Sequence, residues 1–242
     1  MQFKFIFVVP IFVLGLFVFL SVCSAAPNNM VSATVPIVGL SQNGKSFKTF
    51  GSGFVYQWKR RIVTTATVID AVSAKYLIPE NRLGVLTANS GKQMSESSQF
   101  HQVKVTCIDR KANIALLEAD SDLNIKPVNK VRKRLLSAGQ FLSVTGFTGS
   151  GLVQTYFEGV VSFATGTSEG NLFYGLAFPV GIGSTGGPAF DRKTGELLGI
   201  VQLKSRFVAR EIYAGQGAIG ESLGSAIVIP VKTLLEVLEK QK

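Results

Sequence analysis

Short apolar runs separated by Gly, Asn and Ser recur along most of the chain after its first 30 residues. They are rich in Val, Ile, Leu and Phe, which is typical of β-strands bounded by turns. The sequence predicts strands in VSATVPIVGL, SGFVY, RIVTTATVI, GVLTA, HQVKVTCI, IALLEA, GQFLSVTGF, GLVQTYFEGVVSFAT, NLFYGLAF, GPAF, LLGIVQL and SAIVIP. Many short strands in succession indicate an all-β barrel or sandwich.

Helical periodicity is expected only in the C-terminal segment VKTLLEVLEKQK. There Val231, Leu234, Leu235 and Leu238 recur at the spacing of one helix face. A polar and basic stretch, SDLNIKPVNKVRKR, lies near the middle of the chain and predicts a connection between two halves.

The first 25 residues contain one Lys, a long run of Phe, Val and Leu, and then small residues. This pattern is typical of a secretory signal, with cleavage expected near Ala25 or Ala26. An uncleaved membrane anchor and a lipoprotein acylated at Cys23 stay open as alternatives. We therefore expect an exported protein of the periplasm or cell envelope, with secretion or membrane anchorage as the alternatives.

The chain has 242 residues and a net charge of +10, and removal of residues 1–25 takes away only Lys4 among the charged residues, which leaves +9. Such an excess of positive charge favours acidic partners. Removal of the segment also leaves Cys107 as the one remaining thiol, so no internal disulfide is expected. We expect Cys107 to be a small buried residue on a strand.

Four blocks of the sequence resemble trypsin-like serine proteases of the HtrA type, in the family's order. They are GSGFVY with RIVTTATVI, ANIALLEAD, GIGSTGGPAF, and GELLGIVQL with SAIVIPVKTLLEVL. The resemblance implies the chymotrypsin fold: two antiparallel six-stranded β-barrels with a C-terminal helix and the active site between the barrels. Residues 26–242 would form this domain, with a barrel at about 30–121, a connecting loop at about 122–136, a second barrel at about 137–230 and a helix at about 231–240.

At the three positions where this family carries His, Asp and Ser, the chain has Thr67, Asn113 and Thr185. Thr67 cannot accept a proton near neutral pH, and Asn113 cannot stabilise an imidazolium. The hydroxyl of Thr185 is not nucleophilic without a base. We therefore expect a pseudoprotease that acts as a protein-binding or scaffold subunit of a bacterial cell-envelope assembly such as a secretion system. The alternative is a residual or unconventional serine/threonine-type peptidase.

Other features of the family's site are also expected from the resemblance. The N–H groups of Gly183 and Thr185 would form a vestigial oxyanion pocket, and Gly186 would keep its turn; alternatively, these glycines serve only packing. The strand edge at Val201, Gln202 and Leu203 would pair with an extended peptide. His101, the one histidine, is expected on the surface and away from Thr185, and PIVGL is expected to be a first strand.

Two basic groups stand out in the sequence. One is Lys59, Arg60 and Arg61, and the other comprises Lys126, Lys130, Arg132, Lys133 and Arg134. We expect the second group to lie on an exposed loop and to contact an acidic protein surface, with anionic polymers and lipid headgroups as further candidates. Without aromatic residues interleaved among the cations, nucleic acid is not expected as a partner. The sequence offers no cluster of metal ligands and no phosphate-binding loop, so neither a metal nor a cofactor is expected.

Overall fold

The computed structural model describes residues 28–41, 44, 46–76, 82–88, 98–147, 152–166, 172–206 and 223–241. The expected signal segment at residues 1–25, including Cys23, lies outside these residues. Within the part of the chain that the structure describes, no helix has the length and apolar character needed to cross a membrane.

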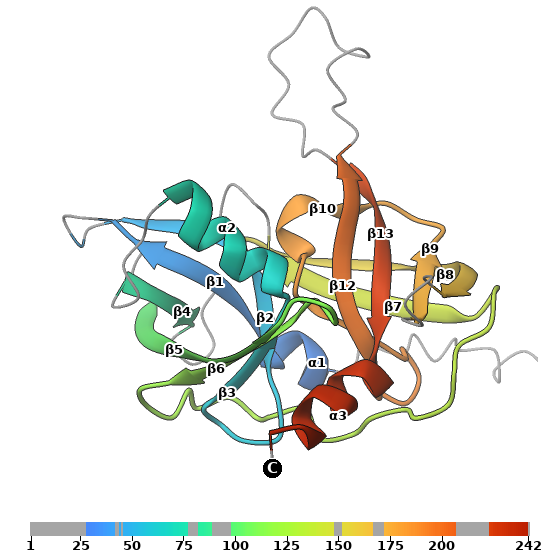
Figure 1. Cartoon of the computed structure of the whole chain (residues 1–242), viewed down its shortest axis with the longest axis horizontal. Coiled ribbons are helices and arrows are strands. Elements are labelled where there is room, and N and C mark those ends of the chain that lie inside the picture. The colour runs from blue at the N-terminus through green and yellow to red at the C-terminus, as the bar shows by residue number, and fades with distance from the viewer. Residues whose placement is uncertain are drawn as a thin grey trace, which may run out of the picture.

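Six antiparallel strands of the N-terminal half close into a barrel in the order β1-β2-β3-β6-β5-β4 (Figure 1). The strands are β1 (Thr34–Leu40), β2 (Phe47–Val55), β3 (Arg61–Thr64), β4 (Leu83–Thr87), β5 (Gln99–Asp109) and β6 (Ile114–Ala119). Their inward-facing residues are apolar and often β-branched, and they fill the barrel with a core that includes Ile37, Val85 and Leu117.

The C-terminal half forms a sheet in the order β10-β13-β12-β11-β7-β8-β9, and β9 also pairs with β13. This additional pairing closes six of the strands into a second barrel, which the short β10 extends. The strands are β7 (Phe141–Phe147), β8 (Gln154–Gly166), β9 (Leu172–Leu176), β10 (Val180–Gly181), β11 (Pro188–Phe190), β12 (Leu197–Arg206) and β13 (Leu223–Pro230). The prediction of two antiparallel six-stranded barrels is confirmed.

Among the described residues, three α-helices accompany the barrels: α1 (Asn28–Ala33), α2 (Ala66–Tyr76) and α3 (Val231–Glu239). The predicted C-terminal helix is confirmed by α3, but the prediction of RIVTTATVI as one strand is wrong. β3 ends at Thr64 and α2 begins at Ala66. The β-branched residues of this run disfavour a helix, yet burial of Val68, Ile69 and Val72 against the N-terminal barrel stabilises one.

A separate apolar cluster joins the two barrels. It contains Phe54 and Val63 of the N-terminal barrel, Phe190 and Ile229 of the C-terminal barrel, and Leu234 of α3. In Figure 1, α3 lies across the base of both barrels. The barrels are therefore packed on one another through a shared core, and the polar edge of that junction forms the candidate site.

The connection between the barrels, residues 120–140, runs along this junction and is attached to both sides. Val128 forms an isolated parallel bridge with Tyr56 at the end of β2, and Val131 forms one with Leu197 at the start of β12. Each bridge is made by backbone hydrogen bonds, including Val128 N to Val55 O at 2.9 Å and Leu197 N to Lys130 O at 2.9 Å. The connection is thus an ordered part of the fold.

Candidate functional site

The structure brings together two of the three residues that the resemblance assigns to the catalytic positions. Thr67 lies in the first turn of α2, and Asn113 lies in the turn between β5 and β6. Asn113 has a φ of 54°, a left-handed conformation that Asn tolerates better than most residues. Both the backbone N–H and the hydroxyl of Thr67 donate to Oδ1 of Asn113, at 2.9 and 2.8 Å. The result is a neutral hydrogen-bonded pair.

The surroundings of this pair differ on its two sides. The Thr67 side is exposed, whereas Nδ2 of Asn113 is buried and has no hydrogen-bond partner among the described residues. A buried carboxylate at the same place would carry an uncompensated charge, and such a charge is far more costly to bury than an amide. The asparagine thus suits a site that lacks an imidazole.

Thr185 follows a 3₁₀ turn formed by Ile182–Ser184 and is 9% exposed. Its hydroxyl accepts a hydrogen bond from Leu203 N of β12 at 3.4 Å, and its carbonyl accepts one from Ser52 N of β2 at 2.8 Å. Among the described residues, no hydrogen bond joins Thr185 to Thr67 or Asn113. Thr185 is therefore tied to the strands on either side of the loop.

The loop around Thr185 has the geometry of a tight turn. In a 3₁₀ turn, the N–H of residue i+3 donates to the carbonyl of residue i, so the N–H groups at its end are directed back into the turn. The carbonyl of Gly183, within the turn, accepts from the hydroxyl of Ser52 at 2.6 Å. Gly186 has a φ of 89°, and a Cβ there would collide with the backbone oxygen of Ser52. Packing between the barrels therefore requires glycine at 186.

Ser52 is a site residue that the sequence does not single out. It is fully buried, and its hydroxyl donates to Gly183 O and accepts from Phe147 N at 2.9 Å. One side chain of the N-terminal barrel thus satisfies two backbone groups of the C-terminal barrel. The only signal in the sequence is a serine between two glycines in an apolar strand, which by itself points to no partner.

The expected peptide-binding edge is only partly available. Val201 is buried, its N–H donates to Gly187 O at 2.9 Å, and its carbonyl accepts from Gly186 N at 2.8 Å. β11 pairs with β12 as far as Ile200, and beyond that point no described strand pairs with this side of β12. Gln202 and Leu203 are both half-buried, and the N–H of Leu203 also contacts the loop through the hydroxyl of Thr185 at 3.4 Å.

His101 is 3% exposed, so the expectation of a surface histidine is wrong. It lies on β5, where alternate residues face the barrel, and its Nε2 and Nδ1 lie 3.0 and 2.9 Å from the hydroxyls of Thr87 and Ser121. Burial lowers the pKa of His101, and the nearby negative charge of Asp120 opposes that shift. Both ring nitrogens are therefore occupied away from Thr67, Asn113 and Thr185.

Cys107 also lies on β5, as expected of a strand residue, but it is only partly buried. It packs against the shared core between the barrels. Among the described residues, no group of three or more His, Cys, Asp or Glu side chains is placed to hold a metal ion.

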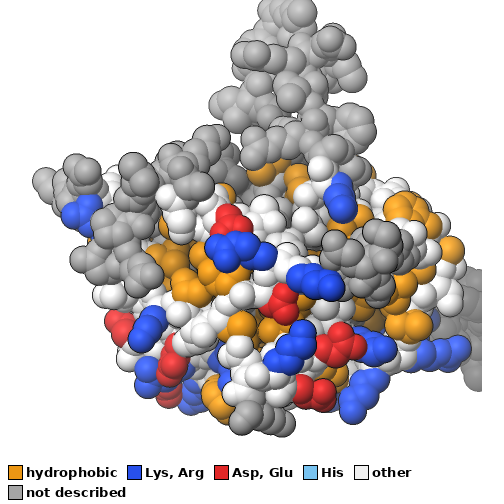
Figure 2. Space-filling view, in the orientation of Figure 1, with side chains coloured by type: hydrophobic (Ala, Val, Ile, Leu, Met, Phe, Trp, Pro, Cys, Tyr) orange, Lys and Arg blue, Asp and Glu red, His pale blue; other side chains and the backbone are white. Residues whose placement is uncertain are grey.

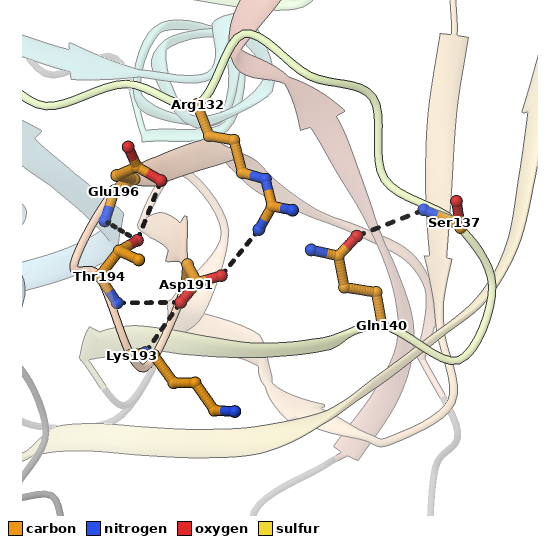
Figure 3. Close-up of polar contacts among 7 residues, drawn as sticks. All are labelled: Arg132, Ser137, Gln140, Asp191, Lys193, Thr194 and Glu196. Carbon is orange, nitrogen blue, oxygen red and sulfur yellow. Dashed lines mark hydrogen bonds and ion pairs between the residues drawn. The ribbon is translucent and has the colours of Figure 1, made fainter.

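Of the five basic residues expected to be exposed in the connection, Arg132 is not. Its guanidinium donates to Oδ2 of Asp191 at 2.8 Å (Figure 3), and the two side chains are 24% and 15% exposed. Oδ1 of Asp191 in turn accepts from the backbone N–H groups of Lys193 and Thr194, at 2.8 and 3.0 Å. Arg132 thus fastens the connection to the β11–β12 turn, whereas the other four residues, Lys126, Lys130, Lys133 and Arg134, are exposed.

Comparison with known proteins agrees with this architecture. Residues 51–200 match the family model of the trypsin-like peptidase domain. A search of curated protein sequences found no match.

Three solved structures show the extent of the similarity. The Rv3671c protease from M. tuberculosis, in its active form, is 21% identical with a TM-score of 0.61 over 88% of this chain and 84% of that chain. The HtrA-type protease AlgW with a decapeptide is 16% identical, with a TM-score of 0.61 over 88% of this chain and 65% of that one. The protease domain of MamO from Magnetospirillum magneticum, without ligand, is 14% identical, with a TM-score of 0.61 over 86% and 97%. This chain thus spans less than two thirds of the AlgW chain.

Proposed function

Because the chain belongs to the family of trypsin-like peptidase domains, we propose that it is a member of the HtrA type without peptidase activity. In this proposal it acts by binding protein, as an exported subunit or scaffold of a bacterial cell-envelope assembly. The observation that carries the proposal is the neutral pair of Thr67 and Asn113, in which both donors of Thr67 are bound to one amide oxygen.

Peptide hydrolysis by a hydroxyl nucleophile requires a group that takes up its proton and a third group that orients the base. Neither a threonine hydroxyl nor an asparagine amide takes up a proton near neutral pH. Where members of a catalytic triad are lost, binding and the oxyanion hole alone retain about 10³ to 10⁴-fold acceleration over water. The pair of Thr67 and Asn113 therefore supports binding over hydrolysis.

The position of Thr185 supports the same conclusion. Its hydroxyl accepts a hydrogen bond from Leu203 N and is nearly buried. Its β-branched side chain is also confined to few rotamers, so the hydroxyl cannot turn freely toward a substrate.

The one imidazole of the chain has hydrogen-bond partners other than Thr67, Asn113 and Thr185. His101, the one histidine of the sequence, has its two nitrogens at the hydroxyls of Thr87 and Ser121. Its pKa is lowered by burial, but its contacts belong to β4 and to the residues that follow β6. The three triad positions are not among those contacts.

What remains of the groove suits recognition of an extended segment. Beyond Ile200, one side of β12 is not paired with a described strand, and Gln202 and Leu203 lie there half-buried. Such an edge adds a strand from a partner through main-chain hydrogen bonds.

The test compares hydrolysis of unfolded, dye-labelled casein by the wild-type chain, Thr185→Ala and Thr185→Ser, with an active HtrA-type protease as the positive control. We expect no turnover by any of the three forms, because Thr185→Ser supplies a hydroxyl but no base. Turnover by the wild-type chain that disappears in Thr185→Ala would show that Thr185 is a working nucleophile. Turnover by Thr185→Ser alone would show that another group serves as the base.

Binding at the groove edge is tested separately. A photo-crosslinking residue at Gln202 is expected to capture a protein from the native envelope. The matched control is the same residue at Gln102, an exposed position on β5 of the other barrel. Equal capture at both positions, or capture at neither, would contradict binding at the edge of β12.

A further inference from the structure

The two basic groups that are separate in the sequence lie side by side in the structure. The turn between β2 and β3 carries Lys59 and Arg60, β3 begins at Arg61, and the connection between the barrels carries Lys126 and Lys130. Gln57 N donates to Val128 O at 3.1 Å, Val128 N donates to Val55 O at 2.9 Å, and Leu123 N approaches Lys59 O at 3.4 Å. Backbone hydrogen bonds thus hold both groups on one surface.

An exposed tryptophan lies within this surface. Trp58 is 63% exposed, and the guanidinium of Arg61 stacks on its ring at 3.7 Å from the ring centre. The turn that carries it is held by Trp58 N to Tyr56 O at 2.7 Å and Arg61 N to Trp58 O at 3.1 Å. The expectation that the basic groups lack aromatic residues is therefore wrong for the first group. We call Trp58, Lys59, Arg61, Lys126 and Lys130 the Trp58 surface.

The charges of this surface are only partly compensated. Arg60 is paired with Glu118 at 3.2 Å and is left out of the definition for that reason. Lys59, Lys126 and Lys130 are exposed and have no ion pair within the described part of the chain. Asp120 and Asp122 are exposed nearby in the sequence and weaken the positive field. Figure 2 shows the same mixture, with many Lys and Arg side chains and fewer acidic ones over the lower half of the molecule.

We propose that the Trp58 surface docks on an anionic lipid membrane. An indole ring combines an apolar body with one N–H donor, and tryptophan is enriched at the level of the lipid headgroups. Lys and Arg around it gain attraction from anionic headgroups, about 1 kcal/mol or fivefold in affinity for each cation. An exposed indole is not required by the fold, because Trp58 belongs to none of the apolar cores.

A membrane is favoured over an acidic protein as the partner by the sequence that precedes the domain. As a signal, the apolar run within residues 1–25 directs the chain to a membrane only during export, and as an uncleaved anchor it would also keep the domain there. One indole with a few cations gives weak, reversible binding by itself, and it becomes effective when a second element also holds the protein at the bilayer. The Trp58 surface is separate from the edge of β12, so this proposal stands independently of the proposed function.

The experiment uses the full chain and its own fluorescence, because Trp58 is its one tryptophan. Vesicles of phosphatidylcholine with about 30% phosphatidylglycerol are expected to shift the emission of Trp58 to shorter wavelength. They are also expected to reduce the quenching of its fluorescence by acrylamide. Pure phosphatidylcholine is expected to do neither, and about 0.5 M salt is expected to reverse both changes. Since the reporter lies on the proposed surface, attachment through another part of the chain would leave its emission unchanged and would contradict the proposal.

Charge variants test whether these lysines matter. Lys126→Gln with Lys130→Gln is expected to lower vesicle affinity roughly 25-fold, since each cation contributes about fivefold. The matched control removes the same charge from exposed positions of the C-terminal barrel, Lys193→Gln with Lys204→Gln. An equal loss in the control would show that net charge alone drives binding. A polyglutamate chain that shifts the emission as strongly as the vesicles would show an acidic polypeptide to be the partner, and the membrane proposal would be wrong.

Discussion

Two serines at the junction of the barrels are equally buried and differ in their hydrogen bonds. Ser52 and Ser184 are both fully buried. The hydroxyl of Ser52 satisfies Gly183 O and Phe147 N, whereas that of Ser184 has no partner among the described residues. Removing a partner from a buried polar group costs the desolvation of that group, but removing an unsatisfied group costs little.

We therefore expect Ser52→Ala to lower the free energy of unfolding by about 2–4 kcal/mol, because two buried backbone groups lose their partner. Ser184→Ala is the matched control and is expected to change it by less than about 0.5 kcal/mol or to raise it. Urea denaturation of the three proteins measures both effects. Equal destabilisation by the two substitutions would show that cavity formation, and not hydrogen bonding, dominates at this junction.

His101 predicts a pH dependence of stability whose sign follows from its burial. Its pKa is lowered in the folded protein, so between that value and the ordinary value of about 6.5 the unfolded chain binds more protons than the folded one. Stability is then lost as pH falls through about 6.5 toward the folded pKa, and it is fully present above that range. Urea denaturation between about pH 5 and 8 measures it.

The control for this measurement is His101→Asn, which removes the one imidazole of the chain. The variant is expected to be less stable above about pH 7, because Thr87 and Ser121 lose a partner, and to show a flatter dependence between about pH 5.5 and 7. If the wild-type protein became more stable as pH fell through this interval, the charged imidazolium would be the stabilised form and the assignment would be reversed.

Among the elements, the connection between the barrels differs most from its expectation. Its polar, basic composition is typical of a solvated linker, yet Val128 and Val131 pair with strands of different barrels. Arg132 pairs with Asp191, and four other cations of the same segment are exposed. Composition alone does not distinguish the paired cation Arg132 from the exposed ones, because the partner of Arg132 lies 59 positions away in the sequence.

Substitution of Arg132 separates a structural cation from an exposed one. Arg132→Gln is expected to lower the free energy of unfolding by about 1–3 kcal/mol, since it removes a charged hydrogen bond that is only partly accessible to water. Arg134→Gln makes the same change at an exposed position nearby and is expected to alter stability by less than about 0.5 kcal/mol. Thermal denaturation of both variants measures the difference. Equal melting temperatures would show that the ion pair of Arg132 does not stabilise the fold.

The sequence predicts some elements of the fold and misses others. The short apolar runs predicted the barrels, because alternation and β-branching report directly on a pleated surface with one buried face. The helix α2 was not predicted, because Val68, Ile69 and Val72 disfavour a helix locally and gain their stability from packing.

At the candidate site, the blocks GSGFVY, ANIALLEAD and GIGSTGGPAF predicted which three positions to compare. The bonds of Thr67 to Asn113 join residues 46 positions apart, and no local pattern indicates the left-handed backbone of Asn113. The contacts of Ser52 and the surroundings of Trp58 were missed for a related reason. Each depends on a segment that is distant in the sequence and adjacent in space.

For the whole molecule, the main feature is the core shared by both barrels and α3. Leu234 of α3 is fully buried in it. Leu234→Ala is expected to lower the free energy of unfolding by about 2–5 kcal/mol. Because the cluster couples both barrels, the protein is expected to unfold in one transition, with Trp58 fluorescence and far-ultraviolet circular dichroism changing together.

Two separated transitions in the wild-type protein would contradict this coupling. Trp58 lies next to β3 and reports on the N-terminal barrel, whereas circular dichroism reports on both barrels. If the N-terminal barrel were independent, the Leu234→Ala substitution would leave the fluorescence transition where it was. A joint shift of both signals is the expected result.

The place of α3 in the chain sets an order for biosynthesis. Phe54 and Val63 of the N-terminal barrel contact a cluster that also contains Ile229 and Leu234. A ribosome completes the first barrel long before it reaches Val231, where α3 begins. During that interval the face of the first barrel that packs against the second barrel and α3 is uncovered. Export of the chain in an unfolded state, with folding only after α3 has crossed the membrane, would avoid exposing that apolar face in the cytoplasm.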